Sequence, residues 1–481
     1  MPRIRTLHVS LVPLALTALA SAQTNYGTGT AGTGGITPRA WFRGSASPGS
    51  SFAVELDRAL GGSPAFVVIG LAPTSVVAAG VEVLVQPVFS VFVGLTGGGA
   101  GVAGAGTAGF AIHVPNSSSF VGLPIHSQWL AVDPGGPQGI SASDGLELHI
   151  EPPPLVLAAG TAGSLDRVYA LDPTTGIAAD WNGAIGADNP VAVEFTPNGE
   201  ICIVGAALSH DFVIADALNN GTVLGSVGVG SALPNDVAIT PDGRRAYGVT
   251  GGPQGSNLGL IIEIDVDPSS PTFGTQIGNV TGIPTGISQL EGVGISADGR
   301  TLAAVNLGLG QAALIVLVDV DPSSATFNTV LRSAPLTGFT ADVRLNRDGS
   351  LAYVSSAGLG GPSSMLVVDT ASGLVVATIP AIGDFPTDVE MSPRGDYVLV
   401  GCPNSDEAVR IDVDPASPGY LSFQSVVLPG QPFAIAIAPD GYTAWCSDQG
   451  GSDLYEIDTT AMTVLRTVPI GTGGADALAV R

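Results

Sequence analysis

The sequence predicts an all-β protein, namely a seven-bladed β-propeller preceded by a small β-sandwich. Its 481 residues are 45% hydrophobic and only 12% charged, with 67 Gly and 36 Pro, a composition typical of a turn-rich globular β-protein. A hairpin pattern recurs every 44–56 residues in the C-terminal two-thirds, and the end of the chain resembles the start of one further repeat. The composition also excludes a collagen repeat, a heptad rod and charge-driven disorder.

Residues 1–22 have the three-part pattern of a secretory signal peptide. Arg3 and Arg5 precede an apolar stretch at residues 9–20, and the small residues Ala20, Ser21 and Ala22 complete the pattern. We expect cleavage after Ala22, because small residues at this place are typical of the cleavage site. The mature protein is therefore expected to be secreted, periplasmic or located at the cell surface, without a membrane span.

Residues 23–151 are predicted to form a separate Gly/Ala-rich domain resembling a β-sandwich. Short β-type runs separated by Gly, Ala, Ser and Pro predict its strands, at residues 51–56, 65–71, 81–93, 110–113 and 146–150. The apolar stretch at residues 64–95 contains Pro73, Glu82 and Pro87, so it predicts buried strands and not a membrane span. Residues 151–154, Glu-Pro-Pro-Pro, are predicted to be a stiff linker, and the propeller is placed at residues 152–481.

Two markers recur through the propeller region. The first is a turn glycine between two apolar runs, at Gly199, Gly243, Gly299, Gly349, Gly395 and Gly441. Glycine accepts the positive φ that a tight turn demands, so each of these residues indicates an antiparallel hairpin. The second marker is an apolar strand that ends in aspartate, at Asp172, Asp216, Asp265, Asp319, Asp369, Asp412 and Asp458.

Seven strand-end aspartates against six turn glycines indicate a circular arrangement. Residues 476–480 repeat the opening of a unit, and residues 155–186 supply the strands that this last unit lacks. One four-stranded sheet does not bury its own faces, whereas sheets stacked radially around a channel bury one another. We therefore expect the C-terminal strand to pair with the first strands of the propeller, which joins the last blade to the first and hides two sheet edges.

The three cysteines, Cys202, Cys402 and Cys446, allow at most one disulfide bridge. Cys402 and Cys446 fall in neighbouring repeats, so they either form a bridge or are two small buried residues. The spacing of Cys and His excludes a structural zinc site.

Segments that follow two of the turns resemble a known repeat. Residues 353–356 (Tyr-Val-Ser-Ser) and 247–250 (Tyr-Gly-Val-Thr) are similar to the YVTN repeat of exported bacterial propellers. That group is similar to the seven-bladed lactonase family, which includes 6-phosphogluconolactonase-like proteins, and it also contains surface proteins without known activity. The resemblance thus implies the fold and leaves open whether the chain is an enzyme.

A set of acidic residues is expected near the start of the innermost strands. Three of them stand seven residues before a turn glycine, one opens the last unit and one is a single position out of register: Asp236, Asp342, Asp388, Asp476 and Glu291. Together they would ring the mouth of the channel and suit a hard cation such as Ca²⁺, the one cofactor that the sequence suggests. The alternative is that each aspartate caps a turn through backbone N–H groups.

Three Asp-x-Asp-Pro segments, which begin at Asp265, Asp319 and Asp412, imitate the start of a calcium loop. They lack the glycine and the distant bidentate glutamate of an EF-hand. These segments therefore predict strand-ending turns.

The charged residues restrict the function. All 16 basic residues are arginine, so Schiff-base chemistry is excluded, and a net charge of −25 disfavours nucleic acid as a partner. His210 is the only histidine of the propeller region, which disfavours haem or copper.

Two functions stay open. The first is a monomeric exported module, binding or surface-associated, with a small molecule or a protein as its unidentified ligand and a cation site at its channel mouth. The alternative is a lactonase-like hydrolase that opens a cyclic ester with channel carboxylates and Arg244, Arg300 or Arg344. Two carboxylates, or a carboxylate and an arginine, that converge in a concave pocket would favour the enzyme.

Overall fold

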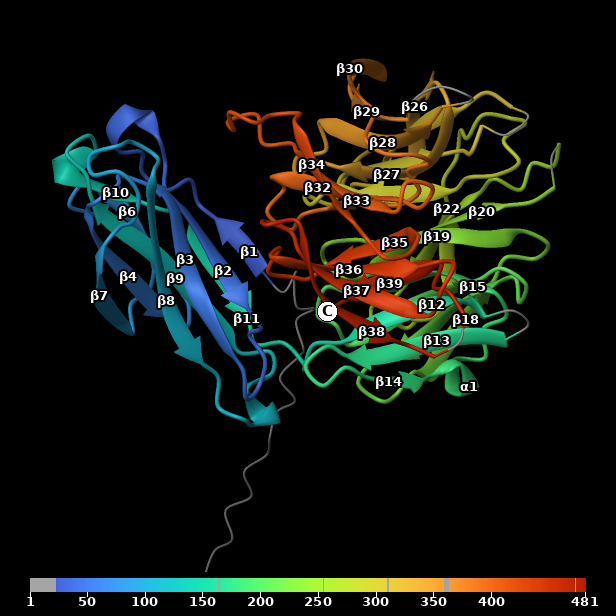
Figure 1. Ribbon diagram of the computed structural model, residues 1–481, viewed down its shortest axis with the longest axis horizontal. Coiled ribbons are helices and arrows are strands. Elements are labelled where there is room, and N and C mark those ends of the chain that lie inside the picture. The colour runs from blue at the N-terminus through green and yellow to red at the C-terminus, as the bar shows by residue number, and fades with distance from the viewer. Residues whose placement is uncertain (1–22, 163–164, 254, 309–310, 359–362, 472) are drawn as a thin grey trace, which may run out of the picture.

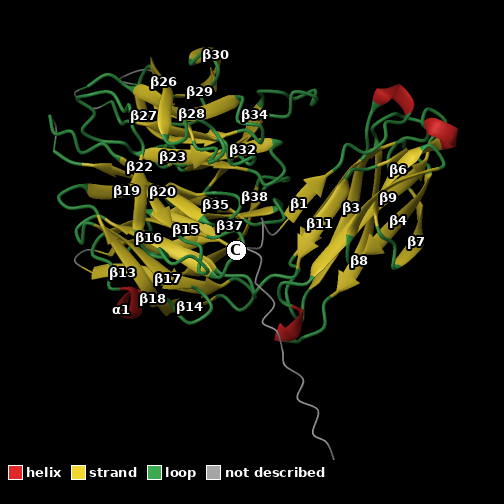
Figure 2. Ribbon diagram, turned by 180° about the vertical axis from the view of Figure 1, so that it is seen from behind, coloured by secondary structure: helices red, strands yellow, loops and turns green. Residues whose placement is uncertain are grey.

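The computed structural model describes residues 23–162, 165–253, 255–308, 311–358, 363–471 and 473–481, so the predicted signal peptide lies outside the described residues. Strands β1 to β11 (blue to cyan in Figure 1) form one body, and the remaining strands (green to red) form a second body beside it. Figure 2 shows the same two bodies from behind, almost entirely as strands and loops. Among the described residues, no helix is long and apolar enough to cross a membrane.

The first body is a β-sandwich. One sheet has the order β1 (Gln23–Tyr26), β11 (Gly145–His149), β9 (Pro124–Val132), β4 (Pro64–Gly70) and β7 (Phe89–Leu95), with β10 (Ile140–Ala142) paired to β9. The other sheet has the order β2 (Arg39–Gly44), β3 (Ser51–Ala59) and β8 (Gly106–His113). A two-stranded ribbon, β5 (Pro73–Ala78) and β6 (Val81–Val85), and three short 3₁₀ helices (Thr33–Gly35, Ser118–Phe120, Pro137–Gly139) complete it.

The sandwich core forms where the two sheets face each other. Phe42 and Phe52 from one sheet pack in one apolar cluster with Trp129 and Leu146 from the other. The predicted single run at residues 81–93 is two strands, β6 and β7, because the chain leaves the ladder around Pro87, which has no N–H to donate.

The second body is the predicted seven-bladed propeller, in which every blade is a four-stranded antiparallel sheet. The first blade contains β12 (Val156–Ala162), β13 (Leu165–Asp172), β14 (Ile177–Asp180) and the C-terminal β39 (Ala477–Val480), and helix α1 (Asn182–Ile185) follows β14. The next three blades are β15 (Pro190–Phe195), β16 (Ile201–Ala206), β17 (Asp211–Asp216), β18 (Thr222–Gly228); β19 (Leu233–Ile239), β20 (Arg245–Gly251), β21 (Ile261–Asp265), β22 (Gln276–Asn279); and β23 (Gly292–Ile295), β24 (Thr301–Val305), β25 (Leu314–Asp319), β26 (Thr329–Pro335). The last three are β27 (Phe339–Leu345), β28 (Leu351–Ala357), β29 (Ser364–Asp369), β30 (Leu374–Pro380); β31 (Val389–Met391), β32 (Tyr397–Cys402), β33 (Glu407–Asp412), β34 (Phe423–Val427); and β35 (Pro432–Ile437), β36 (Thr443–Asp448), β37 (Asp453–Asp458), β38 (Thr463–Pro469).

The C-terminal strand closes the ring, as the sequence predicts. In the first blade, Val480 pairs with Val156 and Leu478 pairs with Ala158. The innermost strands then contact one another in a complete circle, in the order β39, β15, β19, β23, β27, β31 and β35, and back to β39. Strand β39 therefore completes the ring of blades.

The turn between the first two strands of a blade follows the predicted chemistry. All six turn glycines have φ between 67° and 73°. At Gly243, for example, the glycine N–H donates to the carbonyl of Thr240 at 2.8 Å, and the Asp242 carboxylate accepts the N–H of Arg244 at 3.1 Å. A side chain at the glycine would be strained in this conformation, so the repeat keeps glycine there.

The sandwich docks on the end of the propeller that carries these turns. Trp41 Nε1 donates to the carbonyl oxygen of Asp440 at 3.0 Å, and the N–H of Gly44 donates to the Asp440 carboxylate at 2.8 Å. The Arg394 guanidinium lies 3.2 Å from the Asp57 carboxylate and 5.0 Å from the centre of the Trp41 ring. Strands β2 and β3 thus rest on the turns of two neighbouring blades.

The three cysteines are free thiols and are buried. Cys402 and Cys446 belong to different apolar clusters, so of the two alternatives the structure shows buried thiols and not a bridge. Burial raises the pKa of the Cys202 and Cys402 thiols to about 12, which leaves them protonated and unreactive at neutral pH.

Candidate functional site

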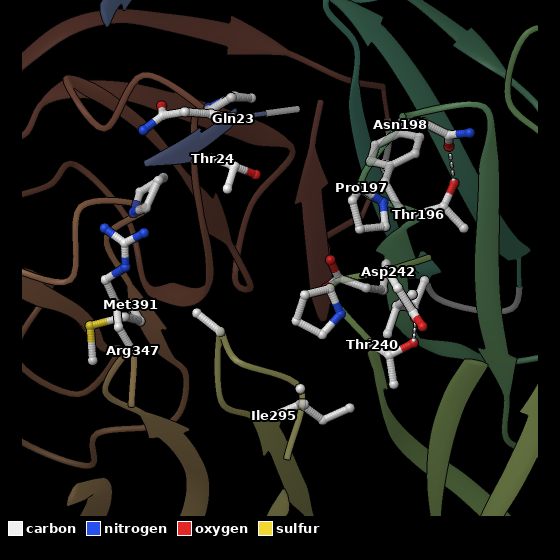
Figure 3. Close-up of a pocket in the computed structure, with 18 of the residues that line it drawn as sticks. Gln23, Thr24, Thr196, Pro197, Asn198, Thr240, Asp242, Ile295, Arg347 and Met391 are labelled. Carbon is white, nitrogen blue, oxygen red and sulfur yellow. Dashed lines mark hydrogen bonds between the residues drawn. The ribbon is translucent and has the colours of Figure 1, made fainter. Parts of the chain in front are cut away.

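A cavity of about 740 Å³ lies where the sandwich covers the channel of the propeller, at the end that carries the turns (Figure 3). Its propeller wall is built in levels, because equivalent positions of successive blades lie at the same height. From the sandwich side, Gln23, Thr24 and Trp41 line it together with Glu151 and Pro152 of the linker. Residues of both the sandwich and the propeller therefore line the cavity.

The middle level of the cavity is apolar. Four residues before each turn glycine, and at Val480 in the closing blade, stands a side chain that lines the cavity: Phe195, Ile239, Ile295, Leu345, Met391, Ile437 and Val480. We call these seven residues the apolar collar. The outer level, two residues before each turn glycine, consists of Pro197, Pro241, Ala297, Arg347, Pro393 and Pro439. One arginine thus stands where the other blades have proline or alanine.

The floor of the cavity is charged. Five residues before their turn glycines, Glu194, Arg344 and Glu390 line the cavity, where other blades carry the small residues Ala238, Gly294 and Ala436. Arg344 Nε lies 3.1 Å from Glu390 Oε2, and Nη1 lies 2.8 Å from Asp342 Oδ1. Its Nη1 also donates to the carbonyl of Val293 at 3.1 Å. Among the described residues, nothing accepts a hydrogen bond from Nη2, so this nitrogen is left for a ligand.

Burial and charge separate the protonation states of the two glutamates. Burial raises the pKa of Glu194 to about 8, and the neighbouring Glu390 carboxylate adds to the rise. Burial also raises the pKa of Glu390, but the Arg344 guanidinium opposes that rise. Burial alone would lower the pKa of Arg344, yet Asp342 and Glu390 hold it well above its usual value. Burial and the Glu390 charge thus favour the protonated form of Glu194, whereas Arg344 favours the ionised form of Glu390 in the same cavity.

The raised pKa of Glu194 makes the stability of the protein fall as pH rises. The native state keeps the Glu194 proton up to about pH 8, whereas the unfolded chain releases it near its ordinary value of 4.5. Between these values the native state binds more protons, so unfolding becomes easier with each increase in pH, by at most about 1.4 kcal/mol per pH unit from this group. We expect Glu194→Gln to remove this slope, measured by urea unfolding at about pH 5 and about pH 8. Parallel pH dependences of the variant and the wild type would contradict this expectation.

Three of the predicted acidic residues pin neighbouring blades together. The carboxylate of Asp236 accepts the N–H of Val293 at 2.9 Å, across to the next blade. Two further bonds repeat this pattern between later blades: Asp342 with Val389 N at 3.0 Å and Asp388 with Ile435 N at 2.6 Å. The sequence analysis gave backbone capping by these aspartates as the alternative to cation binding. The three bonds are of that kind, but the backbone N–H that each carboxylate accepts belongs to the next blade.

The aspartates of this group surround Arg344. Burial raises the pKa of Asp236 to about 7 and that of Asp388 well above its usual value, and the Arg344 guanidinium opposes both rises. Glu291 and Asp476 lie outside the group: burial raises the pKa of Glu291 to about 7, and Asp476 accepts a hydrogen bond from Gln449 at 3.4 Å. Within the described ranges, no three His, Cys, Asp or Glu side chains are placed to hold a metal ion. Calcium binding stays a prediction.

The Asp-x-Asp-Pro segments are strand-ending turns. Asp265 accepts the N–H of Asp267 at 3.0 Å and the hydroxyl of Thr272 at 2.5 Å, and it also accepts the hydroxyl of Ser270. The turn at Asp319 repeats all three bonds, and the turn at Asp412 repeats the first and third. The carboxylate oxygens are thus occupied by donors of the same turn.

Of the three candidate arginines, only Arg344 reaches the cavity floor. Arg244 and Arg300 are largely exposed and pair with Asp267 and Asp321 at 3.6 Å and 3.5 Å. The sequence analysis missed Glu194 and Glu390. The same repeat count would have found them, because both stand five residues before a turn glycine, at the position of Arg344.

A family model and two solved structures resemble parts of this chain. Residues 312–437 match the family described as "Lactonase, 7-bladed beta-propeller". A Bacteroides fragilis protein named as a candidate 6-phosphogluconolactonase has a similar structure, with a TM-score of 0.51 and 17% identity over 68% of this chain and 98% of that one. Hydrazine synthase of Kuenenia stuttgartiensis gives a TM-score of 0.48 and 18% identity over 66% of this chain and 95% of that one. No curated protein matches the sequence.

Proposed function

We propose that the protein hydrolyses a cyclic ester in the cavity between propeller and sandwich, a proposal supported by the match of residues 312–437 to the seven-bladed lactonase family. The observation that carries this proposal is the charged floor, where Arg344 and Glu390 are 3.1 Å apart and Glu194 lines the same cavity. This arrangement meets the requirement of a carboxylate and an arginine converging in a concave pocket. The signal-peptide pattern supports an activity outside the cytoplasm.

Each floor residue has one role in the proposed reaction. Arg344 Nη2 donates to the carbonyl oxygen of the lactone and stabilises the negative charge that develops there. The Glu390 carboxylate takes a proton from water while the water oxygen bonds to the carbonyl carbon. The ring C–O bond then breaks, and the protonated Glu194 gives its proton to the departing ring oxygen. The product is a hydroxy acid, and Glu390 and Glu194 exchange protons with solvent to restore the starting state.

Proton release from lactones tests the proposal directly. In a pH-stat, we expect the purified mature protein to open γ- and δ-lactones, and Glu390→Gln to lower kcat by about 10²–10⁴-fold. We also expect kcat/KM to fall above about pH 8, where Glu194 loses its proton, and this fall to be absent in Glu194→Gln.

Glu407→Gln is the matched control, because the Glu407 carboxylate accepts the hydroxyl of Ser425 on an outer strand and does not line the cavity. Hydrolysis by Glu390→Gln at the wild-type rate would overturn the proposal. Lactone binding without proton release would favour the alternative of an exported binding module.

A further inference from the structure

The sandwich is attached to the propeller along one arc of the ring. Hydrogen bonds, an ion pair and ring contacts join it to turns of the sixth and seventh blades, and the linker enters the first blade. Resting on the proposed use of the cavity, we propose that the sandwich is a hinged cover. It stays attached along this arc and lifts from the third and fourth blades, across the ring, to admit the ligand.

Two neighbouring turns hold the sandwich. The Arg394 guanidinium of the sixth blade pairs with Asp57 at 3.2 Å and lies 5.0 Å from the centre of the Trp41 ring. In the seventh blade, the Tyr442 hydroxyl donates to the Glu55 carboxylate and accepts a hydrogen bond from Arg394 Nη1 at 3.2 Å. One guanidinium thus contacts the sandwich and the turn of the next blade at the same time.

The position just before the turn glycine distinguishes these blades from those across the ring. In the third and fourth blades it holds Asp242 and Asp298, each of which accepts a backbone N–H of its own turn at 3.1 Å. Asp440 of the seventh blade makes the same bond at 3.0 Å, and its second oxygen accepts the N–H of Gly44 at 2.8 Å. In the sixth blade the position holds Arg394. We call Arg394 and Asp440, together with Tyr442, the latch.

The covalent connection lies beside the latch. The linker begins on the sandwich, where the N–H of Glu151 donates to the carbonyl of Ala46 at 2.9 Å. It ends in the first blade, where Leu155 and Arg481 exchange backbone hydrogen bonds of 3.3 Å and 3.0 Å. The three prolines at residues 152–154 make the connection a stiff spacer. Since the first blade adjoins the seventh, latch and linker occupy three consecutive blades.

Polar and charged groups form the interface at the latch. Within the described ranges, the apolar cluster of the sandwich contains no residue of the propeller, and the clusters of the propeller contain none of the sandwich. Trp41 is 4% exposed, but across the interface it contacts the Arg394 guanidinium and the carbonyl oxygen of Asp440. Domains joined without a large apolar interface move relative to one another. This interface therefore suits a contact that opens while both bodies stay folded.

The charged floor closes the cavity on the side away from the sandwich. Arg344 bridges Asp342 and Glu390 there and also donates to the backbone of the neighbouring blade, and Asp342 is buried. A ligand passing through the channel from the opposite end would break these bonds. The way in is therefore on the sandwich side. At the third and fourth blades the outer level of the cavity is Pro241 and Ala297, whose side chains form no hydrogen bonds that would hold a cover shut.

Hydrogen exchange of one amide measures the opening. The N–H of Gly44 bonds to Asp440 across the interface, whereas the N–H of Gly49 donates to a carbonyl inside the sandwich at 3.1 Å. Arg394→Gln removes an ion pair and a cation–π contact with Trp41, so we expect the open state to become about tenfold more populated. The amide of Gly44 is then expected to exchange about tenfold faster, because its exchange follows the open population. The amide of Gly49 is expected to keep its wild-type rate.

Two further variants complete the exchange experiment. Asp57→Asn removes the same ion pair from the sandwich side and is expected to speed exchange at Gly44 in the same direction. Arg244→Gln is the matched control in a turn of the third blade, because Arg244 pairs with Asp267 of its own blade, and exchange at Gly44 is expected to stay at the wild-type rate.

Two results of the exchange experiment would overturn the inference. One is a wild-type rate at Gly44 in both Arg394→Gln and Asp57→Asn, since the latch would then hold nothing. The other is equal acceleration at Gly44 and Gly49, since the sandwich would then unfold and not lift.

Lactone kinetics test whether the cover controls entry. If the closed state predominates, binding scales with the open fraction, so Arg394→Gln is expected to raise kcat/KM by up to about tenfold for a lactone that the wild type opens. Faster exchange at Gly44 with an unchanged kcat/KM would overturn the role of the sandwich in ligand entry. If the wild type opened no lactone, the proposed function would fail, whereas exchange at Gly44 would still decide whether the sandwich lifts.

Discussion

Arg344→Gln is expected to destabilise the protein by about 3 kcal/mol and to abolish lactone hydrolysis. The guanidinium bridges Asp342 and Glu390 and also donates to the backbone of the preceding blade, at Val293. Its loss leaves carboxylates without their counter-charge in a site where burial already disfavours ionisation. At low pH these carboxylates can take up protons, so we expect a larger loss at about pH 8 than at about pH 5. Urea unfolding at both pH values measures the effect.

Arg244→Gln serves as the control for this experiment. Arg244 is half exposed and pairs with Asp267 at 3.6 Å, so its replacement is expected to change stability by less than about 0.5 kcal/mol. If Arg344→Gln and Arg244→Gln unfold at the same urea concentration, Arg344 is not the centre of the charged floor.

Deleting residues 477–481 is expected to abolish the single cooperative unfolding transition of the propeller. The deletion removes β39, which contacts the inner strands β15 and β35 and pairs with β12. Because the ring then has two open ends, strands far apart in the sequence lose their neighbours together. Hydrogen exchange is expected to show faster exchange in β15 and β35 alike. If the amides of both strands exchanged as slowly in the deletion variant as in the wild type, closure by β39 would be contradicted.

A matched pair of leucines tests the same closure with a smaller change. Leu478 in β39 is 7% exposed, and its replacement by alanine is expected to cost about 2–4 kcal/mol. Leu465 in the outermost strand β38 is 52% exposed, and the same replacement there is expected to cost less than about 0.5 kcal/mol.

The fold could be predicted because its signals are local and repeated. A turn glycine with positive φ between two apolar runs indicates a hairpin at each occurrence, and the count of markers indicates a closed ring. The pairing of Leu478 with Ala158 confirms that argument. The break at Pro87 was missed, because an apolar run does not by itself show where a ladder is interrupted.

The site was harder to predict because it depends on which end of the channel is covered. Asp236, Asp342 and Asp388 are as regular in sequence as Glu194, Arg344 and Glu390, and only the structure shows that the first set bonds to neighbouring blades. The docking of Trp41 on Asp440 places the sandwich over the turn end, and no pattern in the sequence indicates that contact.

A crystal structure with a bound lactam tests the central claim most directly, since a lactam keeps the shape of a lactone but resists hydrolysis. The ligand is a γ- or δ-lactam, matched in ring size to a lactone that the protein opens. We predict its carbonyl oxygen within hydrogen-bond distance of Arg344 Nη2, inside the cavity beneath the sandwich. A lactam bound at the opposite end of the channel, beside Asp476, or absent from crystals at concentrations that inhibit hydrolysis, would contradict the account.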